Sequence, residues 1–161
     1  MAPMGKREGD RERSPGLLAA IRKVLNPFVG AFIRAGVAPR SAHILTTRGR
    51  KTGKPRSTPV VLQEHKGRRY LVAAYGEVGW VHNVRAHRRV RLTRGRTTEE
   101  VDVAETEPGE AGAVLKKYVS RWWPTVAPYF DARRSDPVGA FAAEASRHPV
   151  FRLEDGGPNG P

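Results

Sequence analysis

The sequence predicts a mainly β domain, a curled and mostly antiparallel barrel with helices flanking it. Short apolar runs separated by turn residues follow one another along residues 42–103, as in consecutive hairpins. Strands and helices do not alternate there as they would in a βαβ fold, which argues against a Rossmann-type or doubly wound sheet. Long segments with helical periodicity lie only before and after this region.

Length and composition limit the alternatives. A chain of 161 residues fits one domain with a sizeable core. We expect that domain at residues 15–155, between a disordered basic tail at 1–14 and a flexible tail at 156–161. The 29 Lys and Arg against 16 Asp and Glu give a net charge of +13, which attracts anionic partners. Cysteine is absent and the five histidines lack ligand spacing, so neither a disulfide nor a metal site is expected.

Residues 17–37 predict an N-terminal helix. Their apolar positions recur at helical spacing, and Pro27 divides the segment into two pieces. It is too short and interrupted to span a bilayer. Two interpretations stay open, packing on the sheet or lying at a membrane surface. Because the start of the chain lacks the apolar run of a secretory signal, we expect a cytoplasmic, or membrane-peripheral, location.

The remaining elements follow in order. We expect strands at 42–47, 57–64, 69–74, 89–93 and 98–103, and a last short strand at 149–153. Helices are expected at 111–122 and 137–145. The linker between them, 123–131, is stiffened by proline, and its Trp123, Tyr129 and Phe130 either wall a substrate pocket or pack in the core.

The loop after the first strand has the chemistry of an anion site. Residues 45–56 read LTTRGRKTGKPR, in which two glycines allow a close approach of the backbone to a ligand. Arginine, lysine and threonine side chains supply donors. Three residues separate the glycines, and proline follows the second lysine, so this is not a P-loop. The alternative is a solvated basic hairpin.

A short helical segment follows the third strand. Trp80, Asn83 and Val84 share one face of it. Trp80 and Val84 have the character of core residues, whereas the Asn83 amide can both donate and accept hydrogen bonds beside a heterocyclic ring. An aromatic with a polar neighbour is a common way to hold a flat ligand.

These motifs together resemble the deazaflavin-dependent nitroreductase family of actinobacteria. The resemblance covers about residues 17–153 and is strongest in the run at 45–59, followed by VAA at 72–74 and GWVHNVRA at 79–86. It implies a split β-barrel like that of FMN-binding proteins, and hydride delivery from reduced coenzyme F420 to an electron-poor small molecule such as a quinone, an enone or a nitro compound.

The resemblance also implies the site residues. The cofactor would be bound by Thr47, Arg50, Lys51, Thr52, Gly53, Arg56, Pro59, Ala74, Trp80 and Asn83. The cations among them would surround the phosphate and the polyglutamate tail, with Pro59 lining the groove and Trp80 and Asn83 near the ring. Tyr75, Tyr129 or water would supply the proton. Tyr118 is a further candidate for a proton donor or a pocket wall.

This chain departs from the nitroreductase branch in one segment, because the compact 74–79 stands where a longer Ser-Lys-Gly-type segment is expected. The ring contact that the resemblance implies for a lysine in that segment is therefore not carried over to this chain, and Tyr75 is the candidate to replace it. An FMN-binding oxidoreductase on the same barrel is the near alternative. A nucleic-acid-binding module fits the charge, but the aromatic residues do not interleave with the basic strands. A non-catalytic membrane-peripheral protein is a further alternative, and a monomer and a homodimer are both compatible with the sequence.

Overall fold

The computed structural model describes residues 40–154. The predicted tails at 1–14 and 156–161 and the predicted helix at 17–37 lie outside the described residues. The elements are β1 (Ala42–Arg48), β2 (Pro55–His65), β3 (Arg68–Val72), α2 (Gly79–Ala86), β4 (Arg89–Arg94), β5 (Thr97–Glu105), α3 (Pro108–Arg121), α4 (Trp123–Val126), the 3-10 helix η1 (Ala127–Tyr129), α5 (Val138–Ala142) and β6 (Val150–Glu154).

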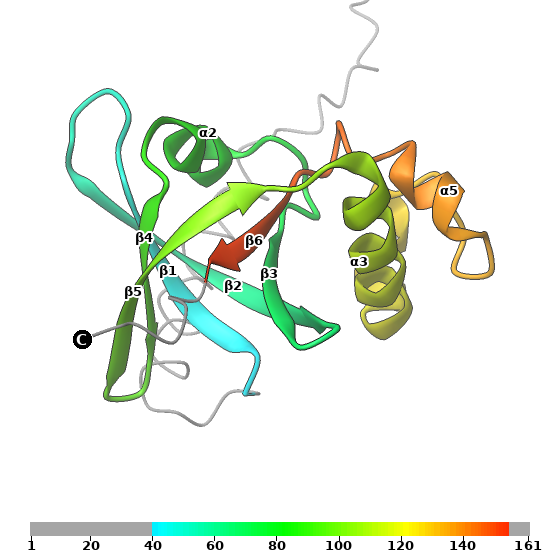
Figure 1. The fold of residues 1–161 in the computed structure, drawn as a ribbon, viewed down its shortest axis with the longest axis horizontal. Coiled ribbons are helices and arrows are strands. Elements are labelled where there is room, and N and C mark those ends of the chain that lie inside the picture. The colour runs from blue at the N-terminus through cyan, green and yellow to red at the C-terminus, as the bar shows by residue number, and fades with distance from the viewer. Residues whose placement is uncertain (1–39, 155–161) are drawn as a thin grey trace, which may run out of the picture.

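The strands form a closed antiparallel barrel in the order β1-β2-β3-β6-β5-β4 (Figure 1). Hairpins join β1 to β2, β2 to β3 and β4 to β5, and β4 pairs back onto β1 to close the ring. The last strand, β6, is inserted between β3 and β5. The predicted antiparallel barrel is therefore confirmed.

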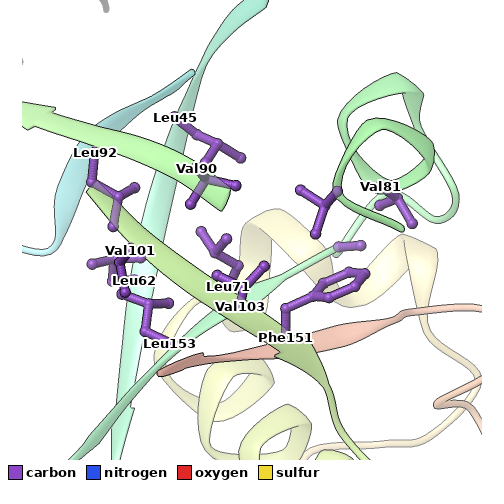
Figure 2. Close-up of a cluster of buried hydrophobic side chains, with 12 residues drawn as sticks. Leu45, Leu62, Leu71, Val81, Val90, Leu92, Val101, Val103, Phe151 and Leu153 are labelled. Carbon is purple, nitrogen blue, oxygen red and sulfur yellow. The ribbon is translucent and has the colours of Figure 1, made fainter. Parts of the chain in front are cut away.

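Apolar side chains on alternate strand positions fill the barrel interior. Each strand contributes apolar side chains that point toward one another, and Val81 and Val84 of α2 join them (Figure 2). The strand members of this cluster are Leu45, Leu62, Leu71, Val90, Leu92, Val101, Val103, Phe151 and Leu153. Helix α2 thus packs against the same apolar cluster as the strands, next to the start of the β1–β2 hairpin.

A second apolar cluster covers the outside of the barrel. Helix α3 packs Val114, Leu115 and Val119 against Tyr70 of β3 and Val150 of β6. Helix α5 lies beside α3 (Figure 1). None of the helices within residues 40–154 is long and apolar enough to cross a membrane.

The C-terminal part differs from the predicted elements in two places. Helix α5 ends at Ala142 rather than at residue 145, because the chain turns there and the Glu144 side chain binds the backbone of Asp131 and Ala132. The predicted linker 123–131 contains α4 and η1. Each of these short helices has a proline in its first turn, where a missing N–H costs little.

Candidate cofactor site

A cavity of about 840 Å³ opens beside the β1–β2 hairpin. Part of its lining comes from that hairpin and the start of β2, and the rest comes from the turn after β3, from α2 and from η1. The lining residues are Thr47, Gly49, Arg50, Lys51, Thr52, Arg56, Ser57, Thr58, Pro59, Tyr75, Val78, Gly79, Trp80, Asn83 and Tyr129. All the predicted cofactor-binding residues except Gly53 and Ala74 are among them, and so are Tyr75 and Tyr129.

The hairpin has a backbone shape that its glycines permit. The Gly49 N–H donates to the Lys54 carbonyl and the Gly53 N–H donates to the Gly49 carbonyl, both at 2.8 Å. A Cβ at Gly49 would lie 3.0 Å from the Lys54 carbonyl oxygen. Gly53 has a φ of 68°, a region that other residues rarely adopt. Gly53 therefore shapes the loop from outside the cavity.

The cations of the cavity have no acidic partner in the part of the chain that the structure describes. Within residues 40–154, no carboxylate lies within ion-pair distance of Arg50, Lys51 or Arg56. Elsewhere an arginine such as Arg85 is held by two glutamates, at 2.7 and 2.8 Å. A cavity with three uncompensated positive charges favours an anionic ligand.

Asn83 connects α2 to this hairpin. Its Oδ1 accepts from the Arg50 backbone N–H at 3.1 Å and from the Arg50 guanidinium at 3.3 Å. Its Nδ2 donates to the Thr47 hydroxyl at 3.1 Å. Asn83 and Thr47 are both buried. The amide predicted to contact a cofactor ring is therefore engaged in holding the hairpin onto the helix.

Trp80 and Val84, both predicted to have the character of core residues, differ in the structure. Val84 is buried in the barrel interior. Trp80 is partly buried, packs its ring edge-to-face with Phe151 at 5.7 Å between centroids, and also lines the cavity. Trp80 therefore offers the cavity an aromatic surface that is fixed from behind by the core.

Tyr75 and Tyr129 meet at the cavity. Their rings make an edge-to-face contact with centroids 4.8 Å apart, and both side chains are about half exposed. Tyr118 does not line the cavity, because it belongs to the cluster between α3 and the barrel. Burial, with a smaller effect from Tyr75, raises the pKa of Tyr118 to about 12. Tyr118 is thus a core residue with a weakly acidic phenol.

The remaining aromatic residues of the linker pack away from the cavity. Phe130 and Trp123 contribute to the cluster under α3, and so does Ala74, the other predicted residue outside the lining. Five lining residues were not among the predicted site residues, namely Gly49, Ser57, Thr58, Val78 and Gly79. Ser57 had a signal in the sequence, because it lies two positions before Pro59 on the same strand and so on the same face.

Comparison with known proteins identifies the family. The family model for F420H(2)-dependent quinone reductases matches residues 36–138, which is more than half of the chain. The chain belongs to this family. The predicted resemblance to deazaflavin-dependent reductases is thereby confirmed, and the protein is an F420H2-dependent oxidoreductase. The nitroreductase activity and the actinobacterial source stay predictions.

Solved structures that are less than 25% identical in sequence share the fold. A structure of the F420-H2 dependent reductase FDR-A is 24% identical, with a TM-score of 0.50, and the match covers 71% of this chain and 95% of that one. A structure described as a domain-swapped dimer is 21% identical, with a TM-score of 0.52 and coverages of 86% and 97%. The protein Atu2129 of Agrobacterium tumefaciens is 18% identical, with a TM-score of 0.53 and coverages of 84% and 57%. These likenesses show the split-barrel fold.

The side chains of the cavity fit the cofactor of the family. F420 carries a phosphodiester and several carboxylates, and Arg50, Lys51 and Arg56 are cations without ion-pair partners in the described chain. Hydroxyls of Thr52, Ser57 and Thr58 add neutral donors. Together with the aromatic face of Trp80, the cavity combines charge for a polyanion with a flat surface for a ring.

Proposed function

We propose that this cavity is the place where reduced F420 and a small electron acceptor meet. When bound, the cofactor supplies a hydride. The observation that supports this site is the presence, in one cavity, of three unpaired cations and an exposed pair of tyrosines. The cations bind the anionic part of the cofactor, and Trp80 orients its ring.

The acceptor in this proposal is a quinone, in keeping with the name of the family. Tyr75 and Tyr129 form the aromatic wall on which a flat acceptor stacks, and one of their hydroxyls donates the proton that follows the hydride. Enones and nitro compounds are the competing acceptors. Steady-state rates with a naphthoquinone, a cyclic enone and a nitroimidazole at equal concentrations would rank the three acceptor classes. If the naphthoquinone is not reduced fastest, the proposal of a quinone acceptor is wrong.

The cofactor site is tested by titration. We expect F420 to quench tryptophan fluorescence at a concentration at least tenfold lower than FMN does. Arg50→Ala and Lys51→Ala each weaken F420 binding by about 1–3 kcal/mol, or about 5- to 150-fold, because a charge-assisted hydrogen bond is lost. The loss is largest at low salt, since screening weakens these contacts.

Lys54→Ala is the matched control. Lys54 belongs to the same hairpin and carries the same charge, but it does not line the cavity. Its removal should change F420 affinity by less than threefold. Equal losses in Lys51→Ala and Lys54→Ala would show that the net charge of the hairpin, and not this cavity, attracts the cofactor.

The proton donor is tested with Tyr75→Phe and Tyr129→Phe. A donating hydroxyl contributes on the order of a hundredfold or more to kcat. If both variants keep kcat within tenfold, water supplies the proton and the tyrosines act only as walls. The cytoplasmic location and the membrane contact of residues 17–37 stay predictions.

A further inference from the structure

A buried carboxylate lies in the turn after α5, outside the cavity lining. Glu144 is only 3% exposed. Its Oε1 accepts from the Asp131 backbone N–H at 2.7 Å and from the Arg147 guanidinium at 3.0 Å. Its Oε2 accepts from the Ala132 backbone N–H at 2.9 Å. A buried charge is costly unless it is hydrogen-bonded in this way, so Glu144 fixes the backbone at residues 131–132.

The segment that Glu144 fixes carries Tyr129. Tyr129 is the last residue of η1, two positions before Asp131, and its own side chain is half exposed. Between them Phe130 is buried, and its ring stacks on His148 with centroids 4.0 Å apart. The place of Tyr129 at the cavity is therefore set by its neighbours in the chain and not by burial of its own ring.

The same turn also reaches the segment that carries Tyr75. The His148 Nδ1 lies 3.3 Å from the Ala73 carbonyl oxygen, and the Ala73 N–H donates to the Pro149 carbonyl at 2.9 Å. Gly76, directly after Tyr75, has a φ of 90°, and a Cβ there would lie 3.5 Å from the Arg147 carbonyl oxygen. Residues 144–149 thus contact both segments that bring the two tyrosines together.

We propose that Glu144 is a positioning residue for the acceptor side of the cavity, acting through Tyr129. Its carboxylate fixes the η1 segment, and with it the contact of Tyr129 with Tyr75. This inference rests on the proposed function, in which an acceptor stacks on these rings. Glu144 itself lies beyond residue 138, where the match to the family model ends, whereas the backbone that it binds at Asp131 and Ala132 lies within the match.

The test uses Glu144→Gln in the full chain. The variant keeps the size of the side chain, but its NH2 group cannot accept a bond from one of the two backbone N–H groups. We expect the KM for a naphthoquinone to rise about tenfold and the Kd for F420, measured by fluorescence, to stay within twofold. Glu99→Gln is the matched control, because Glu99 binds Arg69 on the barrel away from the cavity, and it should leave both constants unchanged.

A readout without cofactor or turnover separates this inference from the proposed function. In the apoprotein, amide hydrogen exchange at Asp131 and Ala132 should be at least tenfold faster in Glu144→Gln, with unchanged exchange in the β1–β2 hairpin. If the wild type binds no F420 and reduces no acceptor, the proposed function fails. If exchange at residues 131–132 is unchanged, the positioning role fails by itself.

A double mutant distinguishes positioning from general stability. In a Tyr129→Ala background, Glu144→Gln should leave the acceptor KM unchanged, because the residue through which it acts is gone. Additive effects on KM would overturn the proposal. Should Glu144→Gln not fold, Arg147→Met removes the exposed arginine that binds both Glu144 and Asp131 and leaves the carboxylate in place. This variant should raise the KM two- to fivefold, whereas an unchanged KM counts against the positioning role.

Discussion

Asn83→Ala should weaken cofactor binding without removing any charge. The side chain of Asn83 makes two hydrogen bonds to Arg50 and one to Thr47. In the variant the Arg50 guanidinium turns to solvent at little cost. The Arg50 N–H and the buried Thr47 hydroxyl lose a partner, since the only other hydrogen bond of that hydroxyl within residues 40–154 is a long one of 3.5 Å to the Arg56 carbonyl.

Two net hydrogen bonds are worth about 1–3 kcal/mol. That free energy holds the hairpin against α2 before the cofactor arrives, so in Asn83→Ala it has to be recovered from binding. The Kd for F420 is therefore expected to rise by about 5- to 150-fold. Urea denaturation should show a loss of stability of similar size.

The assay is fluorescence titration at several salt concentrations. Because Arg50, Lys51 and Arg56 all remain, the slope of log Kd against log salt should equal that of the wild type, whereas Arg50→Ala should flatten it. His82→Ala is the control, since His82 lies on the same helix but does not line the cavity. An Asn83→Ala protein that is destabilised but binds F420 as tightly as the wild type would refute the idea that the hairpin must be held in place.

Two further substitutions test the packing around the site. Gly112→Ala should cost about 1–3 kcal/mol of stability, because the new Cβ would lie 2.7 Å from the backbone of α5, whereas Gly109→Ala on the same helix has open space and should be neutral or stabilising; equal melting temperatures would contradict this. Burial pushes the pKa of the Glu110 carboxyl up, but hydrogen bonds from Tyr70 and Arg152 outweigh it and hold that pKa below its usual range. The stability that these hydrogen bonds contribute is present above about pH 4.3 and is lost as the pH falls through the lowered pKa. The stability of Glu110→Gln should therefore fall less steeply with decreasing pH than that of the wild type. Identical acid denaturation curves would argue against a stabilising role of the Tyr70 and Arg152 contacts.

The barrel was predictable because its signal is local. Alternating residues such as Val90 and Leu92 place one face of each strand inside, and short turns dictate antiparallel pairing. The insertion of β6 between β3 and β5 was not predictable, because no turn joins it to either strand. The basic loop could be recognised for the same reason, since its glycines and cations are close together in the sequence.

The residues around Tyr129 were harder to predict from the sequence, for a physical reason. Tyr129 reaches the cavity while Phe130, its neighbour, packs on His148. No composition or spacing distinguishes these two aromatic residues, and the carboxylate that binds the backbone directly after them, Glu144, lies more than ten positions further along the chain. The hydrogen bonds of the Asn83 amide could not be predicted either, because its partners Arg50 and Thr47 lie more than thirty positions away in the sequence.

Two buried polar side chains, Asn83 and Glu144, hold different segments around the cavity. The β1–β2 hairpin, where we propose that the cofactor binds, is held onto α2 by one buried amide. The η1 segment, where we propose that the acceptor binds, is held by one buried carboxylate. Because the two anchors share no residue, substitutions at Asn83 and Glu144 should add in their effects on stability. With the cofactor and the acceptor placed as we propose, we therefore expect substitutions in residues 123–148 to change acceptor preference while F420 affinity stays the same.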